Sequence, residues 1–144
     1  MTKHVWTIIC RESVINRENN ALSLMNVFEG LQIEIGKEAP REINIPINYE
    51  IITFLRKSKK SEEENIEQRV SIIDPNGVLT VDPLVVPIKT EKGKFNHRQI
   101  IKSIGFKITV AGSYQFIIEL KQPEGKFEVV AMIPLEVTIS RKNS

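Results

Sequence analysis

The last third of the chain, from Arg98 to Ile139, alternates apolar and polar residues with a period of two. A β-strand with one face in a core and the other in water has this period. The apolar positions of matching parity are Ile100, Ile104, Phe106, Ile108 and Val110, then Tyr114, Phe116, Ile118 and Leu120, and finally Phe127, Val129, Ala131, Ile133, Leu135, Val137 and Ile139. The sequence therefore predicts three consecutive strands.

Shorter segments upstream show strand-like apolar patterns between turn signals. They predict strands at Val5–Cys10, Ile47–Leu55, Ile66–Ile73 and Val78–Val81. The last two are separated by Asp-Pro-Asn-Gly, in which proline presets φ and Asn-Gly tolerates positive φ. Pro83 and Pro87 lack backbone donors, so the segment between them belongs to a sheet edge or to a crossing between sheets.

The segment Leu22–Leu31 fits two kinds of element. Leu22, Leu24 and Phe28 suit one face of a strand, whereas Leu24, Phe28, Leu31 and Ile35 also suit the stripe of a helix. We favour a pair of strands with a bend near Glu29 and Gly30.

The spacing of these segments gives about seven or eight short strands without a required helix. A chain of 144 residues is long enough for one domain with one core. We therefore predict a single all-β domain over residues 1–144. The expected architecture is a two-sheet antiparallel Greek-key sandwich of the immunoglobulin-like or C2-like type.

A corner motif lies at the start of the second of the three C-terminal strands. Gly112 and Tyr114 stand in the sequence Ala-Gly-Ser-Tyr-Gln-Phe. In the tyrosine corner of Greek-key sandwiches, the tyrosine hydroxyl turns back onto the backbone just upstream. We interpret Tyr114 as such a structural residue, with Gly112 permitting a tight approach. A catalytic acid is the less favoured alternative.

Two parts of the sequence resemble a known family. They are Val5–Cys10 with Asn19–Glu29, and Gly112–Phe116 with the final hairpin. Together they resemble an uncharacterised prokaryotic β-sandwich family, a domain of unknown function. The resemblance spans nearly the whole chain and implies the sandwich fold and a bacterial, phage or archaeal origin. It supplies no catalytic or binding residues.

The inventory of reactive side chains is small. Cys10 is the one cysteine, and neither His4 nor His97 has the spacing of a metal ligand. The motifs of a nucleophile elbow and of phosphate-binding loops are missing from the sequence. We therefore expect no enzymatic activity, no cofactor and no metal. No signal peptide or membrane span is visible, so we expect a cytoplasmic protein without membrane contact.

Charge gives little guidance about partners, because 20 Lys and Arg residues stand against 18 Asp and Glu residues. One modest basic neighbourhood surrounds Phe95 and consists of Lys89, Lys92, Lys94, His97 and Arg98. A solvated loop is the simpler interpretation, and a nucleic-acid surface is the alternative. We do not expect nucleic acid to be the main partner.

The absence of a catalytic motif favours a non-enzymatic protein-interaction or assembly module, because sandwiches offer sheet edges that accept partner strands. The alternative is a ligand-binding domain for carbohydrate or nucleic acid. Val130 and Met132 make the second face of the final strand partly apolar. We therefore expect a homodimer or a protein partner to cover that face.

Overall fold

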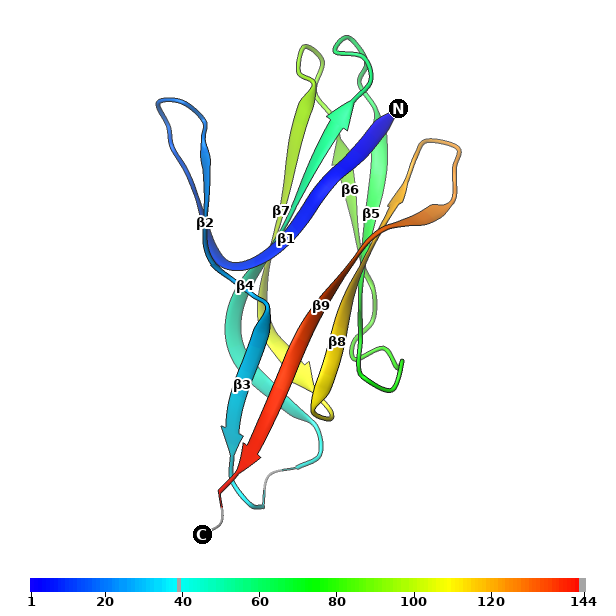
Figure 1. Ribbon diagram of the computed structural model, residues 1–144. Coiled ribbons are helices and arrows are strands. Elements are labelled where there is room, and N and C mark those ends of the chain that lie inside the picture. Colours follow the sequence, from blue (N-terminus) through cyan, green and yellow to red (C-terminus); the bar gives the residue numbers. More distant parts are fainter. Residues whose placement is uncertain (39, 143–144) are drawn as a thin grey trace.

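The computed structural model describes residues 1–38 and 40–142, and these residues form nine β-strands and no helix (Figure 1). The all-β prediction is confirmed. The strands are β1 (Thr2–Ile15), β2 (Leu22–Val27), β3 (Gly30–Ile35), β4 (Ile43–Lys57), β5 (Asn65–Ile73), β6 (Leu84–Lys89), β7 (Asn96–Ile108), β8 (Gly112–Lys121) and β9 (Phe127–Arg141).

The strands form two sheets. The four-stranded sheet has the order β2-β1-β4-β7 and is antiparallel, and the five-stranded sheet has the order β3-β9-β8-β5-β6. The expectation of a wholly antiparallel sandwich was wrong, because β3 runs parallel to β9. Only Phe28 and Glu29 separate β2 from β3. The chain therefore keeps its direction as it passes between the sheets and meets β9 in parallel (Figure 1).

The ambiguous segment Leu22–Leu31 is thus a strand pair, as we favoured, with its bend at Phe28 and Glu29. The two strands lie in different sheets. Leu31 and Ile33 of β3 pack against the core, with the alternation of a strand that has one solvated face. The helical interpretation fails because Leu31 and Ile33, two positions apart in β3, contact the core together, as strand periodicity requires.

The core lies between the two sheets, and its centre is aromatic. Tyr49 of β4 meets Phe116 of β8 edge to face at a centroid distance of 6.0 Å, and Phe106 of β7 meets Tyr114 of β8 at 5.5 Å. Such pairs contribute beyond the burial of their area. A smaller buried cluster consists of Leu55, Ile66, Ile88 and Leu120.

Two bulges change which residues face the core. The register between β4 and β7 shifts where Pro46 and Ile47 oppose Gly105, whose φ is +87°. An extra residue in one strand of a pair moves the following side chains to the opposite face. As a result Ile104 is 82% exposed, and Ile101 is buried. The prediction that Ile104 shares the core parity of Phe106 was wrong for this reason.

The second bulge lies in β9. Ile118 pairs with Ala131 and Glu119 pairs with Val129, so Val130 is the extra residue. Val130 packs against both buried clusters, and Val129 is 56% exposed. The sequence pattern had assigned these two neighbours to the opposite faces.

The predicted strand at Val78–Val81 was also wrong. The segment is a loop with one isolated bridge, between Ile73 and Leu79. The carboxylate of Asp74 accepts hydrogen bonds from the backbone N–H groups of Asn76 and Val78, which closes the turn. Beyond it, among the described residues, only two backbone bonds join the loop to the end of β5, from the N–H of Asp74 to Val78 and from the N–H of Thr80 to Ile72. The proline-bracketed segment forms β6, which pairs only with β5 and is an edge strand as predicted.

The N-terminal hairpin folds back over the sheet to which it belongs. β1 pairs with β4 from Thr2 to Cys10 and with β2 from Cys10 to Ile15. Between these halves the strand turns sharply (Figure 1). Its second half contacts β4, where Ser13 bonds to Glu50, and its tip contacts β7, where Arg98 bonds to the carbonyl oxygen of Asn20. The hairpin of residues 11–27, here called the folded-back hairpin, thus lies over the outer face of the four-stranded sheet.

Candidate functional site: the β7 edge and its cleft

The most prominent open edge belongs to β7. This strand is 13 residues long and pairs on one side with β4, and it has no strand partner on the other side within the described part of the chain. The other three edge strands, β2, β3 and β6, are six residues long each. An unpaired edge presents a row of backbone donors and acceptors that can pair with another chain.

An apolar cleft of about 410 Å³ opens beside this edge, between the two sheets. Its walls are mainly aliphatic and aromatic, and its mouth carries both polar and apolar residues. The wall includes Ile51, Val70, Ile72, Ile101 and Phe106, and the mouth includes Thr80, Val81, Asp82, Leu84 and Lys107. We call this space the edge cleft.

The edge cleft exists because β5 extends beyond the end of its pairing with β6. β6 pairs with β5 only from Asn65 to Val70, so the last residues of β5, Ser71 to Ile73, lack β6 beside them. The loop that takes its place, residues 78–83, is not a strand and leaves Val81 and Leu84 exposed at the mouth. Apolar side chains of both sheets therefore remain accessible between β7 and this loop.

Tyr49 provides a buried polar group in the lining of the edge cleft. Its ring packs among the core aromatics, and it pairs with Ser103 of β7 in the ladder. Burial raises the pKa of Tyr49 above its ordinary value, and the neighbouring Ser103 side chain opposes that rise. The hydroxyl is thus a neutral hydrogen-bonding group, suited to orienting a ligand in an apolar site.

The Gly112 and Tyr114 pair lies outside the edge cleft. Tyr114 is fully buried, and its hydroxyl donates to the carbonyl oxygen of Val110 at 2.6 Å. The hydroxyl oxygen of Tyr114 in turn accepts from the backbone N–H groups of Thr109 at 2.8 Å and Val110 at 3.1 Å. These are the contacts of a tyrosine corner. Solvent does not reach the side chain, so a catalytic role has no geometric support.

Gly112 permits a close approach to the turn after β5. Its φ is +136°, and a Cβ atom at this position would lie 2.9 Å from Cγ of Pro75. A larger residue would push the corner away from the Asp74 turn. The glycine therefore joins the β7–β8 connection to the β5 turn, a neighbour that the sequence did not indicate.

Val130 and Met132, the predicted interface pair, are separated by the β9 bulge. Val130 packs inward against the core clusters, and Met132 is 57% exposed. The exposed neighbour of Met132 is Val129. The apolar patch on the outer face of β9 therefore consists of Val129 and Met132, and Val130 is not part of it. The role of this patch as an interface stays a prediction.

The histidines and the cysteine are not brought together. His4 and His97 both pair with Leu55, whose side chain faces the core, so the two histidines lie on the inner face of the four-stranded sheet. Cys10 follows the inward-facing Ile9 in β1 and therefore lies on the outer face. Burial lowers the pKa of His4, whose ring bonds to Thr7 at 2.7 Å. Among the described residues, no three His, Cys, Asp or Glu side chains are grouped to hold a metal ion.

Sequence reasoning located the edge strand β6 but missed the edge cleft. Its residues come from β4, β5, the 78–83 loop, the start of β6 and β7, which are spread along the chain. The one available signal was the pair of prolines, which marked an edge without showing what lies beside it.

Comparison with known proteins does not place the chain in a family. No family model matches the sequence, and no curated protein matches it. Within residues 1–38 and 40–142, the structure contains no helix that is long and apolar enough to span a membrane.

Proposed function

We propose that this chain is a non-enzymatic protein-interaction module that binds an extended peptide segment by strand addition to β7. The observation that carries this proposal is the 13-residue edge of β7 bordering the edge cleft. In strand addition, backbone hydrogen bonds supply affinity and pockets for alternate side chains supply specificity. The β7 edge offers the first and the edge cleft offers the second.

The partner has a definable chemistry. A strand added to β7 directs every second side chain toward the space between the sheets, where Ile101 and Phe106 favour aliphatic or aromatic residues. β7 contributes Arg98, Lys102 and Lys107 and contains no Asp or Glu. The intervening positions of the peptide therefore favour acidic side chains. The proposed ligand is an extended segment that alternates apolar and acidic residues.

Selection from a displayed library of random linear peptides tests the proposal. We expect selected peptides to alternate apolar and acidic residues. On binding, backbone amides of β7 should become protected from hydrogen exchange, because the added strand pairs with them. Protection confined to β3 and β9, with no change in β7, is the result that contradicts strand addition at this edge.

A matched pair of variants tests the role of the edge cleft. Val81→Asp places a charge at its mouth, and Val78→Asp makes the same change in the same loop outside it. Both side chains are exposed, so both variants should fold. We expect only Val81→Asp to weaken binding of the selected peptides, by about tenfold or more. If the two variants bind the peptides equally well, the proposal that an apolar side chain of the peptide enters the edge cleft is contradicted.

We infer a Greek-key sandwich related to the uncharacterised prokaryotic family that the sequence resembles. The Tyr114 corner supports the inference, since such corners occur in Greek-key sandwiches. A cytoplasmic location and a second copy of the chain as partner are further expectations. Fractionation of native cells and light scattering on the purified protein test them.

A further inference from the structure

A second hollow lies on the outer face of the four-stranded sheet, at the tip of the folded-back hairpin. Its volume is about 600 Å³, within the usual range of ligand pockets. We call it the basic groove. The side chains that set its chemistry are Phe54, Arg56, Lys60, Lys94, Phe95 and Arg98.

The charge in the basic groove is unbalanced, although the whole chain is nearly neutral. Four cationic side chains face one carboxylate, that of Glu91, which is already paired with Lys94 at 2.8 Å. Arg56, Lys60 and Arg98 form no ion pair with the part of the chain that the structure describes. A concave site with one dominant sign of charge attracts an anion.

Flat surfaces accompany the cations. The guanidinium of Arg56 lies over the ring of Phe95, 4.9 Å from its centroid, and both side chains are exposed. Phe54 is stacked on Trp6 with a centroid distance of 5.5 Å and an interplanar angle of 19°. Nucleobases stack on aromatic rings and on arginine planes. The groove thus combines phosphate-binding groups with surfaces for a planar ring.

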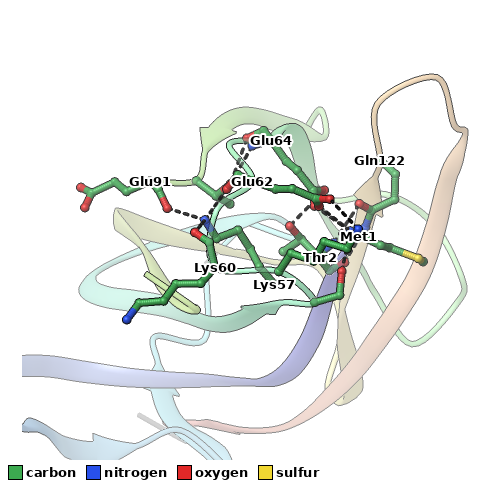
Figure 2. A network of polar contacts seen from close by, with 11 residues as sticks. Met1, Thr2, Lys57, Lys60, Glu62, Glu64, Glu91 and Gln122 are labelled. Atoms are coloured by element: carbon green, nitrogen blue, oxygen red, sulfur yellow. Dashed lines mark hydrogen bonds and ion pairs between the residues drawn. The ribbon is translucent and has the colours of Figure 1, made fainter. Parts of the chain in front are cut away.

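Lys57 joins the two loops that border the basic groove, and Figure 2 shows its contacts with Lys60, Glu62 and Glu91. This buried ammonium donates to the carbonyl oxygens of Lys60, Glu62 and Glu91, the second at 2.5 Å. It thereby joins the two loops, residues 58–64 and 90–95, that carry Lys60, Lys94 and Phe95. The backbone N–H of Gly93 also donates to the carbonyl oxygen of Lys60 at 2.8 Å. Preorganised loops lower the entropic cost of binding.

From this arrangement we propose that the basic groove binds a phosphorylated nucleoside unit. The phosphate contacts Arg56, Lys60 and Arg98, and the base stacks on Arg56 and Phe95. A free nucleotide and a single-stranded nucleic acid share this chemistry. The proposal does not depend on strand addition at β7, because the edge cleft has a different lining and only Arg98 takes part in both proposals.

Fluorescence anisotropy and calorimetry test the proposal with three probes at low salt, about 50 mM. The probes are a labelled oligothymidylate of about twelve nucleotides, a spanning length for one domain, adenosine triphosphate, and inorganic triphosphate. Saturable binding of the oligonucleotide alone identifies single-stranded nucleic acid as the ligand. Comparable binding of adenosine triphosphate identifies a free nucleotide. Failure of both, or equal affinity for inorganic triphosphate, overturns the proposal.

Matched variants assign the binding to the groove. Arg56→Gln and Lys60→Gln should each weaken binding by about tenfold and reduce its salt dependence, whereas Lys126→Gln, an exposed lysine outside the groove, should change neither. Phe95→Ala should weaken the binding of the oligonucleotide and of adenosine triphosphate by about tenfold. Equal effects of Lys60→Gln and Lys126→Gln, or no effect of Phe95→Ala in a variant that melts like the original protein, contradict the site.

Discussion

Ser13 donates two hydrogen bonds to the carboxylate of Glu50, one from its backbone N–H at 3.0 Å and one from its hydroxyl at 2.6 Å. Ser13 belongs to the folded-back hairpin, and Glu50 lies buried on the outer face of β4. Hydrogen bonds to a charged group are stronger than those between neutral groups. This contact therefore holds the hairpin against the sheet.

Replacing Ser13 by alanine removes the hydroxyl bond. We expect the free energy of unfolding to fall by about 1.5–3 kcal/mol, the usual contribution of a hydrogen bond to a charged group. Hydrogen exchange should accelerate mainly in residues 11–27, because the hairpin loses its contact with β4. Ser23→Ala, at an exposed position on β2, is the control and should change little. Uniform acceleration over the whole chain would contradict this local role.

Tyr114→Phe should destabilise the fold. The change leaves the backbone donors of Thr109 and Val110 and the carbonyl oxygen of Val110 without the hydroxyl that they contact. We expect a loss of about 1–3 kcal/mol in urea unfolding, because these groups are left unsatisfied. Tyr49→Phe loses only a side-chain contact with Ser103 and should cost less. An unchanged melting curve for Tyr114→Phe is the contrary result.

Asp74 should make the free energy of unfolding depend on pH in the acid range. The N–H of Val78, the Thr109 hydroxyl and the N–H of Asn76 hold the pKa of this carboxyl below its ordinary value of 3.8. Its contribution is complete above that value and is lost as pH falls through the lower folded-state pKa. Asp74→Asn should therefore lose stability at about pH 7 and approach the original protein as the pH falls below the lowered pKa of Asp74. A pH-independent difference between the two urea curves would contradict the linkage.

Lys57→Met keeps the length of the buried side chain and removes its ammonium group. Three carbonyl oxygens then lose their donor, so we expect a loss of about 1–3 kcal/mol and faster exchange in residues 58–64 and 90–95. Lys59→Met, in the same loop but exposed, should stay within about 0.5 kcal/mol of the original protein. Similar losses for both lysines would show that Lys57 does not join the loops.

Self-association through the outer face of β9 should depend on Val129 and Met132. Both are exposed, and neither contributes to the buried clusters. If this face joins two copies, Val129→Lys combined with Met132→Lys should convert a dimer into a monomer in light scattering at micromolar concentration, because charges in an apolar interface are costly. A monomeric original protein would exclude the homodimer and leave only a different partner for this face.

Much of the fold follows from local sequence pattern. Alternation at residues 98–139 predicted β7, β8 and β9, and Pro83 and Pro87 predicted an edge at β6. These predictions hold because side-chain period and the missing donor of proline are properties of a few neighbouring residues. The loop at Val78–Val81 escaped this reasoning, since the Asp74 carboxylate takes the N–H of Val78 and the pairing with β5 ends after a single bridge.

The candidate sites were far less accessible from sequence. Phe95 and its basic neighbours were visible as one segment, but Arg56, Lys60 and Phe54 join them only in the folded chain. The edge cleft likewise draws Ile51, Val70 and Ile101 from three strands. Sequence neighbours reveal a charged loop, whereas a concave site needs walls from distant segments.

The sequence by itself determined that the chain is all-β, because sustained alternation of apolar and polar residues leaves the strand as the element that buries one face. Only the tertiary structure decided which residues face inward at Ile104 and Val130, since a single extra residue in a paired strand reverses the faces that follow. It also decided the parallel pairing of β3 with β9 and the folding back of the hairpin. Those features depend on contacts between segments far apart in sequence, such as Ser13 with Glu50, and local periodicity carries no information about them.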